Sequence, residues 1–209
     1  MPSQAPIPSI AAERLPNGPE LWRLILAEMP RGAVIAGGAV RDYLLGFEPK
    51  DIDVFMAIPP VSSEPIPFEL DADADWDAIA AHDPRHGLMR IDNTHQRFEE
   101  YTAVSNIVCV SSGKLLGWPV DAIDLDDFEG GEKLIDQFDF AITRCWFGGG
   151  EVIHDTPEAK RDRDNRTITL LSDAREARSL ARYERLKERW GDEWALVREI
   201  LTKEKPHGQ

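Results

Sequence analysis

Apolar and polar positions in the first part of the chain predict two short helices and two strands. The first helix has apolar side chains at helical spacing, begins near Pro19 and is stopped by Gly32. The second helix ends at Gly46, and glycine is the preferred residue just after a helix. The predicted elements are a helix over 19–29, a buried strand over 33–36, a helix over 39–45 and a strand over 50–56.

The second half of the chain predicts four more strands and a helical end. Apolar residues recur at helical spacing from Leu180 to Trp190, and Gly191 breaks this stripe. Runs of β-branched and aromatic residues between turn residues mark the strands. The predicted elements are strands over 106–112, 118–125, 138–147 and 151–154, a helix over 130–137, a helix that begins at 172 or 173, and a helix over 193–203.

These elements together predict an α/β fold with one main domain. We expect a small mixed sheet of about five strands with flanking helices, and a C-terminal helical hairpin beside it. Residues 1–18 hold four prolines and little periodicity, which is typical of a flexible arm. The main domain is expected over 19–171 with a variable insertion over about 60–105, and 172–209 form the helical segment.

The charge of the chain does not favour a general nucleic-acid binder. Its 24 Lys and Arg residues face 38 Asp and Glu, a net charge of −14, whereas phosphate backbones need positive partners. The charge is uneven, because residues 160–189 hold ten basic residues and six acidic ones. This basic segment is either an ordinary solvated helix face or a basic rim beside a functional site.

The absence of targeting patterns and the small number of cysteines indicate where in the cell the protein is expected. No apolar run is long enough for a membrane span, and the N-terminus lacks a signal pattern. Cys109 and Cys145 are too few for a disulfide framework. We therefore expect a cytoplasmic protein with reduced thiols and no membrane partner.

The chemistry is concentrated after the first and within the second predicted strand. Gly37 and Gly38 stand at a helix N-terminus, where glycines leave backbone amides open to phosphate oxygens. Asp51 and Asp53 flank one residue of a strand, so both side chains point to the same face. Two carboxylates on one face are good ligands for Mg²⁺. Phosphates above metal ions indicate nucleotidyl transfer.

The stretch GGAVRDYLLGFEPKDIDVF over 37–55 resembles the head-domain signature of the CCA-adding enzyme and bacterial poly(A) polymerase family, among the DNA polymerase β-like nucleotidyltransferases. The shared pattern is a double glycine, x-Val-Arg-Asp, a Leu-Leu-Gly helix end and Asp-x-Asp. Fainter similarity extends over about 33–171. The resemblance implies a palm-type head over 19–171, an NTP substrate, and Mg²⁺ or Mn²⁺ as cofactor. It leaves 172–209 as a short neck-like segment without the family's long body and tail.

The resemblance implies that Asp51 and Asp53 are catalytic metal ligands, together with a third carboxylate on the neighbouring strand. Asp121 and Asp124 both lie between apolar residues. They are three positions apart, so on one strand they face opposite sides and one of them can reach the metals. Asp121 matches the family's register better and is the preferred third ligand.

The resemblance also implies a set of nucleotide-binding residues: Gly37, Gly38, Arg41, Lys50 and Asp139. Arg41 would meet phosphate, or instead pair with Asp42 or with a helix C-terminus. Asp139 matches the aspartate of the family's Arg-Arg-Asp motif, which is associated with the ribose, but Gln137 and Phe138 replace the two arginines. The family's base-selecting Glu-Asp-x-x-Arg motif is also poorly kept over 172–176, so selection of CTP and then ATP is not implied.

The predicted activity is metal-dependent transfer of a nucleoside monophosphate from an NTP to an acceptor hydroxyl, with release of pyrophosphate. The expected acceptor is an RNA 3′ end such as that of tRNA, contacted by the basic segment 160–189. One alternative is a minimal transferase that modifies a protein or a small molecule, which the acidic composition favours. Another is a catalytically degenerate module that only binds a nucleotide or a partner, and the intact Asp51 and Asp53 do not favour it.

Overall fold

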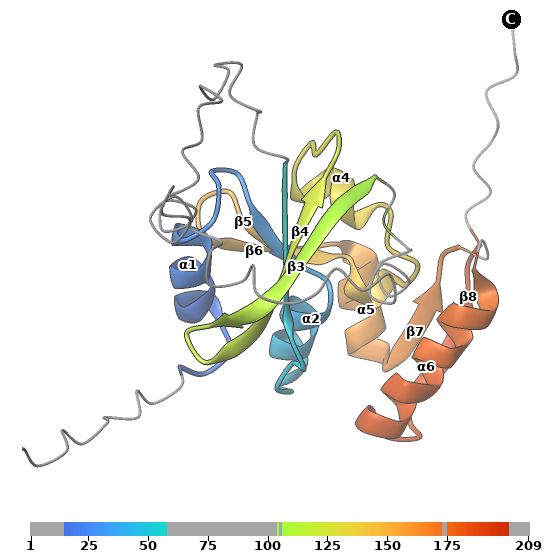
Figure 1. Ribbon diagram of the computed structural model, residues 1–209. Helices are drawn as coiled ribbons and strands as arrows, with labels where there is room; N and C mark the ends of the chain where they lie inside the picture. The colour runs from blue at the N-terminus through green and yellow to red at the C-terminus, as the bar shows by residue number, and fades with distance from the viewer. Residues whose placement is uncertain (1–14, 58–103, 105, 173–174, 201–209) are drawn as a thin grey trace, which may run out of the picture.

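The computed structural model describes residues 15–57, 104, 106–172 and 175–200 (Figure 1). The expected insertion over 60–105 and the expected arm over 1–18 lie largely outside these residues. The helices are α1 (Pro19–Ala27), α2 (Gly38–Leu45), α4 (Gly131–Ile135), the 3-10 helix η1 (Ala141–Thr143), α5 (Pro157–Asn165) and α6 (Glu176–Trp190). The strands are β1 (Val34–Ala36), β2 (Ile52–Ala57), β3 (Ile107–Leu115), β4 (Trp118–Leu125), β5 (Cys145–Gly148), β6 (Val152–Asp155), β7 (Thr167–Leu170) and β8 (Ala195–Arg198).

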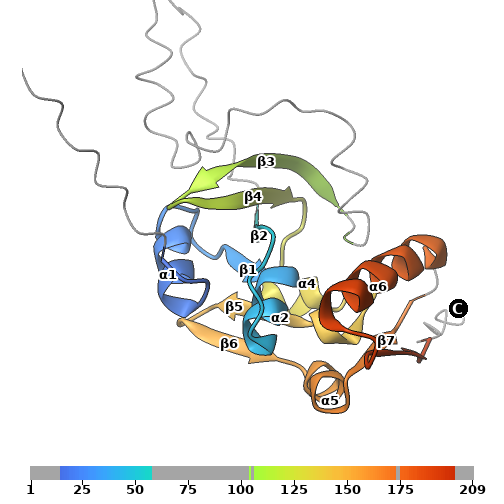
Figure 2. The same ribbon diagram turned by 90° about the horizontal axis from the view of Figure 1, so that it is seen from below.

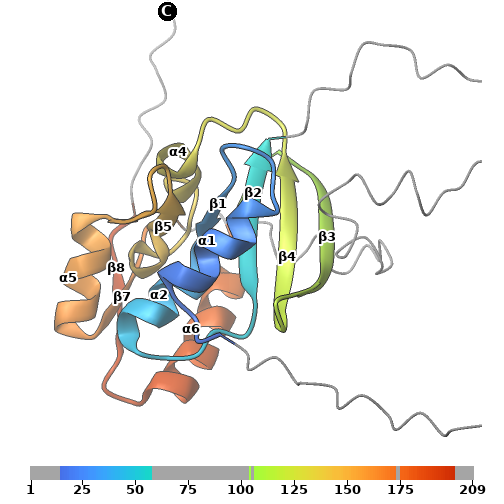
Figure 3. The ribbon, with the colours of Figure 1, turned by 90° about the vertical axis from the view of Figure 1, so that its left-hand side faces the viewer.

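A six-stranded mixed sheet forms the centre of the molecule, in the order β3-β4-β2-β1-β5-β6. β2 and β4 run parallel, and the other neighbouring pairs are antiparallel. α1 and α2 cover one face of this sheet, and α4 packs on the opposite face (Figure 3). The predicted α/β class and small mixed sheet are therefore confirmed.

Apolar clusters bury both faces of the central sheet, which explains why its inner strands are nearly continuous apolar runs. Under α1 and α2, the buried side chains of the strands are Ile35, Ile52, Val54, Met56, Trp118, Val120, Ala122, Cys145 and Phe147. On the α4 face, they are Val34, Ala36, Phe55, Val110, Ile123 and Leu125. The residues of β2 thus alternate between the two faces, and this alternation decides where its aspartates point.

A smaller unit follows the sheet and packs beside it (Figure 2). β7 and β8 form a parallel two-stranded sheet, and α6 lies against it through the apolar stripe that the sequence predicts. This third cluster contains Phe140, Ile142, Ile168, Leu170, Tyr183, Leu186, Trp190 and Trp194. The unit carries α6 to the side of the central sheet where the candidate site lies.

The predicted C-terminal helical hairpin is wrong in its second half. Ala195–Arg198 forms β8 rather than the start of a helix, and it pairs with Thr167–Leu170 of β7. Trp194, immediately before β8, is buried in the third cluster. Strand pairing and burial of this ring outweigh the weak local preference for a helix.

Two further local predictions need correction. The strand expected over 138–147 is divided, because η1 (Ala141–Thr143) precedes β5. The expected arm over 1–18 is anchored at its end, since the Trp118 indole donates a hydrogen bond to the Leu15 carbonyl (2.8 Å) and the Trp22 indole donates one to Asn17 (2.8 Å). Among the described helices, none has both the length and the apolar character of a membrane span.

Candidate active site

Strand register brings two of the predicted carboxylates together. Asp53 on β2 is the direct neighbour of Asp121 on the parallel strand β4. Directly opposed residues of neighbouring strands point to the same face, so both side chains lie on the face that carries Phe55 and Ile123. Asp51 lies immediately before β2 and two positions from Asp53 along the chain.

The same strand register places the two candidates for the third carboxylate on opposite faces of the sheet. Asp124 pairs with Met56 and therefore faces the cluster under α1 and α2. Asp121 shares the face of Asp53 and is buried, with 9% of its surface exposed. Of the two, Asp121 is the residue whose position suits a shared metal site with Asp53.

The glycine turn between β1 and α2 lies next to Asp53. Gly37 adopts φ 73° and ψ −120°, a conformation that is essentially restricted to glycine, and its amide donates a hydrogen bond to the Cys145 carbonyl (3.0 Å). A side chain here would also approach the Phe138 ring, because a Cβ on Gly37 would lie 3.3 Å from it. The turn therefore requires glycine and presents the N-terminus of α2 beside the carboxylates.

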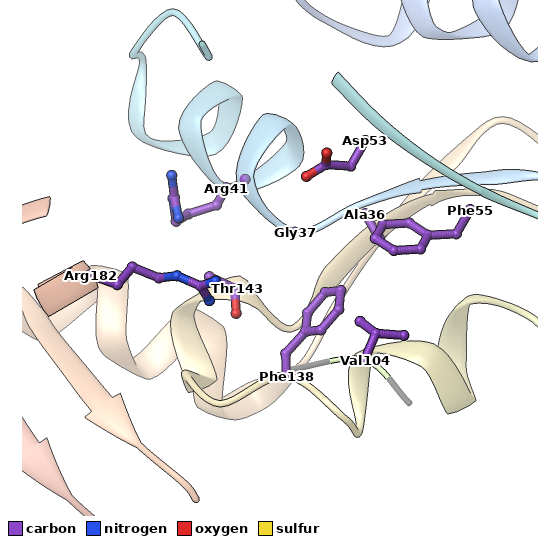
Figure 4. Close-up of a pocket in the computed structure, with 10 residues that line it drawn as sticks. Ala36, Gly37, Arg41, Asp53, Phe55, Val104, Phe138, Thr143 and Arg182 are labelled. Atoms are coloured by element: carbon purple, nitrogen blue, oxygen red, sulfur yellow. The ribbon is translucent and has the colours of Figure 1, made fainter. Parts of the chain in front are cut away.

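A cavity of about 190 Å³ joins these features (Figure 4). One part of its wall is polar, with Asp53, Arg41, Arg182 and Thr143, whereas the other part is apolar. The apolar wall consists of Ala36, Phe55, Val104 and Phe138, and Gly37 and Gly38 also line the cavity. An open cavity with a charged half and an aromatic half suits a ligand that has both phosphate and ring groups.

Arg41 is held in a buried ion-pair network as well as lining the cavity. Its guanidinium lies 2.6 Å from the Asp42 carboxylate and over the Trp190 ring, 4.9 Å from the ring centre. Arg189 of α6 binds the other oxygen of Asp42 (2.9 Å). Of the alternatives that the sequence left open for Arg41, the structure shows the pair with Asp42, and the contact with phosphate stays a prediction.

Asp139 does not line the cavity and instead binds two side chains of α6. Ser179 donates a hydrogen bond to one carboxylate oxygen (2.7 Å), and Arg182 donates one to the other (3.0 Å). Arg182 continues into the wall of the cavity. The expected contact of Asp139 with a ribose stays a prediction, and Lys50 is exposed and does not line the cavity.

Arg182, Phe138 and Thr143 line the cavity, but sequence reasoning did not assign them to a site. Arg182 was visible only as one of the basic residues over 160–189. One signal in the sequence could have indicated a role for Arg182. Ser179 and Arg182 lie on one helix face, at the i and i+3 spacing that lets both side chains reach one carboxylate. No local feature indicates that this carboxylate is Asp139.

The donor set fits a hard divalent cation that keeps part of its water shell. Among the described residues, no group of three or more His, Cys, Asp or Glu side chains converges into a closed metal site. Mg²⁺ does not require one, because it is usually bound by one or two carboxylates together with waters and substrate phosphates. Asp53 and Asp121 supply such carboxylates side by side, with Asp51 close in sequence.

The Cys145 thiol lies behind the glycine turn but is not a nucleophile. It is fully buried, and its sulfur is 3.8 Å from the carbonyl oxygens of Gly37 and Thr143. Burial, the largest cause, raises the pKa of this thiol from 9.0 to about 12. Cys145 therefore stays a neutral thiol that supports the turn.

Solved structures with a similar fold include CCA-adding enzymes. One complexed with ATP has a TM-score of 0.50 and 19% identity, and the match covers 88% of this chain and 40% of that chain. The Thermotoga maritima enzyme complexed with tRNA has a TM-score of 0.48, 18% identity and coverage of 91% and 42%. The Bacillus stearothermophilus enzyme in complex with CTP has a TM-score of 0.47, 17% identity and coverage of 86% and 41%. This chain thus spans about two fifths of the length of these enzymes. The likeness to the ATP complex is one of fold.

Comparison by sequence leads to a different family name. No curated protein matches the chain. A family model described as "Gabija anti-defense 2 family protein" matches residues 13–159, which is more than half of the chain and includes the glycine turn, Asp51, Asp53 and Asp121. The protein belongs to the Gabija anti-defense 2 family.

Proposed function

We propose that this protein is a metal-dependent nucleotidyltransferase. The observation that carries the proposal is the pairing of Asp53 with Asp121 on one sheet face, with Asp53 and the glycine turn in the wall of one cavity. In the proposed reaction, an acceptor hydroxyl oxygen bonds to the α-phosphorus of an NTP. The bond from this phosphorus to the bridging oxygen breaks, pyrophosphate leaves, and the hydroxyl proton passes to water.

Each part of the site has a role in this proposal. Asp51, Asp53 and Asp121 hold Mg²⁺ or Mn²⁺, which when bound neutralises phosphate charge and activates the acceptor oxygen. The backbone at Gly37 and Gly38 lies close enough to the cavity to bind phosphate oxygens at the N-terminus of α2. Arg41 and Arg182 lie at the same wall, where each guanidinium is already paired with a carboxylate of the chain, Asp42 and Asp139 respectively. These residues act by positioning and by charge complementarity.

The cavity size indicates which part of the nucleotide it takes. At about 190 Å³ it is smaller than the roughly 300 Å³ at which sites for whole small molecules begin. It therefore suits the phosphates and the adjacent sugar, and the apolar wall at Phe55 and Phe138 suits stacking against a ring.

The acceptor expected from the resemblance is an RNA 3′ end, and the basic segment 160–189 was its expected contact. In the fold, at least six of the ten basic residues in that segment form ion pairs with acidic residues of the same chain: Arg161, Arg163, Arg166, Arg182, Lys187 and Arg189. Charge that is already paired contributes less to binding of RNA phosphates.

A hydroxyl on a protein or a small molecule is the second candidate acceptor, and three observations favour it. The net charge of −14 opposes binding of a polyanion. The basic segment is largely paired within the chain. The family is named for anti-defense against Gabija, which points to a target that belongs to Gabija rather than to tRNA maturation.

The test is to incubate the purified protein with Mg²⁺ and each α-labelled NTP, in the presence of total RNA, total cell protein and the Gabija components. An Asp51→Ala/Asp53→Ala variant serves as the control. Label on protein that the variant does not transfer would support a modifying transferase, and label on RNA would identify an RNA-tailing enzyme. Absence of label with intact NTP binding would contradict transferase activity and leave the binding-module alternative.

A further inference from the structure

Ser112 extends the carboxylate row onto a third strand. It lies on β3 directly opposite Asp121, which in turn lies opposite Asp53. Directly opposed residues share a sheet face, so Ser112, Asp121 and Asp53 form one row across β3, β4 and β2. Neighbouring strands are about 4.8 Å apart, which brings the Ser112 hydroxyl within reach of Asp121 or of a group bound to it.

The side chain of Ser112 is buried and carries a polar hydroxyl. Ser112 is 5% exposed, and within the described part of the chain its Oγ has no hydrogen-bond partner. A buried hydroxyl that makes no hydrogen bond destabilises the folded state, and buried polar groups in proteins are nearly always paired. An orphan hydroxyl beside a candidate metal-binding carboxylate therefore indicates a partner that is present only when the site is loaded.

We propose that Ser112 is a positioning residue of the metal site, whose hydroxyl binds a water of the cation bound at Asp121. This inference rests on the proposed function, because it requires a cation at Asp53 and Asp121. Mg²⁺ and Mn²⁺ retain waters when they are bound by few carboxylates, and a hydroxyl can accept from or donate to such a water. Groups of this kind that surround metal ligands orient them and strengthen metal binding.

Ser111 provides a matched control on the same strand. It lies opposite Ala122, whose side chain belongs to the cluster under α1 and α2, so Ser111 faces away from the carboxylate row. Ser111 and Ser112 thus have the same chemistry and adjacent positions, but only Ser112 shares the face of Asp121.

The test measures Mn²⁺ affinity by electron paramagnetic resonance, with the full chain and the metal alone, and melting temperature without metal. Ser112→Ala is expected to weaken Mn²⁺ binding about tenfold, as is typical when a group around a metal ligand is removed. The metal-free melting temperature should stay unchanged or rise, because an unpaired buried hydroxyl has been removed. Ser111→Ala should bind Mn²⁺ like the wild type, and Ser112→Thr, which keeps the hydroxyl, should restore affinity.

The outcomes separate this inference from the proposed function. Asp53→Asn should abolish the Mn²⁺ site, and a wild-type protein with no site that depends on Asp53 would overturn both proposals. A wild-type site that Ser112→Ala leaves intact would overturn only the role of Ser112. A lower metal-free melting temperature in Ser112→Ala, with unchanged affinity, would show instead that the hydroxyl has a structural partner.

Discussion

Asp121 and Asp124 lie on the same strand but on opposite faces of the sheet, which allows a direct test of the third carboxylate. Asp121→Asn removes a negative charge beside Asp53 while keeping the size of the side chain. Loss of one metal-binding carboxylate is expected to cost about 3 kcal/mol of transition-state stabilisation, or about 100-fold in the rate of nucleotidyl transfer. The measurement is kcat with a saturating NTP and the acceptor that the labelling experiment identifies.

Asp124→Asn is the control, because Asp124 pairs with Met56 on the other face and is similarly buried, at 8% exposed against 9% for Asp121. Its transfer rate should stay within about twofold of the wild type once both variants are shown to be folded by circular dichroism. A transfer rate that falls for Asp124→Asn and not for Asp121→Asn would show that Asp124, not Asp121, is the third metal-binding carboxylate.

Cys145 should be unreactive towards thiol reagents in the folded protein, whereas the partly exposed Cys109 should react. Since burial raises the pKa of Cys145 from 9.0 to about 12, almost no thiolate forms at pH 8. Titration with a chromogenic disulfide should detect one rapidly reacting thiol in the native state and two in denaturant. Two fast thiols in the native state would contradict the buried position.

The same pKa shift predicts how stability depends on pH. A thiol with a raised pKa keeps its proton longer in the folded state than in the unfolded state. Its contribution to the free energy of unfolding is therefore complete below pH 9 and is lost as the pH rises towards 12. Replacement by Ser or Ala should flatten this part of the stability profile measured by denaturant unfolding.

At the scale of residues, the sequence predicted the parts of the site that lie close together in the chain. The glycine turn and Asp53 follow from local patterns, and the strand period assigns a face to each aspartate. Arg182 could not be assigned, because it reaches the cavity through the packing of α6 on Asp139. Local patterns do not encode such a tertiary contact.

The turn between β1 and α2 is the element most sensitive to a single methyl group. Gly37→Ala places a side chain at φ 73° and ψ −120°, near the Phe138 ring. We expect a loss of about 1–3 kcal/mol in the free energy of unfolding, together with weaker NTP binding, because the α2 N-terminus moves. Denaturant unfolding and an NTP-binding titration measure the two effects.

Gly46→Ala is the matched control at the other end of α2. Gly46 also has a positive φ of 77°, but its ψ of 19° lies in the left-handed helical region, and no atom lies within 4 Å of an added Cβ. This variant should lose about 1 kcal/mol of stability and keep NTP affinity. Equal losses of affinity in the two variants would indicate a general effect of α2 instability rather than a role of the turn.

Asp139 is one of the residues that attach α6 to the site. Asp139→Ala removes the acceptor for Ser179 and Arg182, both of which have side chains that are at least partly buried. We expect a loss of about 1–3 kcal/mol in the free energy of unfolding and a higher KM for NTP, because Arg182 loses the contact that holds it at the cavity. Unfolding curves and steady-state kinetics test both parts.

Lys187→Ala, in the same helix, should change neither quantity measurably. Lys187 pairs with Asp192, whose side chain is fully exposed, and such surface pairs contribute little. A KM that rises equally in Lys187→Ala and Asp139→Ala would mean that general loosening of α6, not the Arg182 contact, affects nucleotide binding.

Helices and strands were predicted well where the apolar spacing within the segment itself defines the element. α1, α2 and the stripe of α6 follow from helical spacing, and β2 and β4 from apolar runs. β8 was predicted as a helix because its strand state depends on β7, a partner distant in the sequence. Pairing with a remote strand is a tertiary effect that overrides local propensity.

At the scale of the whole molecule, the distribution of charge predicts weak binding to RNA. With a net charge of −14, the chain repels a polyanion, and at least six of the ten basic residues over 160–189 are paired internally. At most about four phosphate contacts can come from the rest of this segment. The logarithm of the binding constant should then fall with the logarithm of salt concentration with a slope no steeper than about −4.

The measurement is fluorescence anisotropy of a labelled tRNA acceptor hairpin between about 50 and 200 mM salt, where a protein with six or more phosphate contacts loses affinity by orders of magnitude. A weak complex with a shallow slope would agree with an acceptor that is not RNA, because the ion pairs of α5 and α6 would be serving the fold. A slope steeper than about −5 would show that these pairs open to phosphate, and would return the RNA 3′ end to first place among the acceptors.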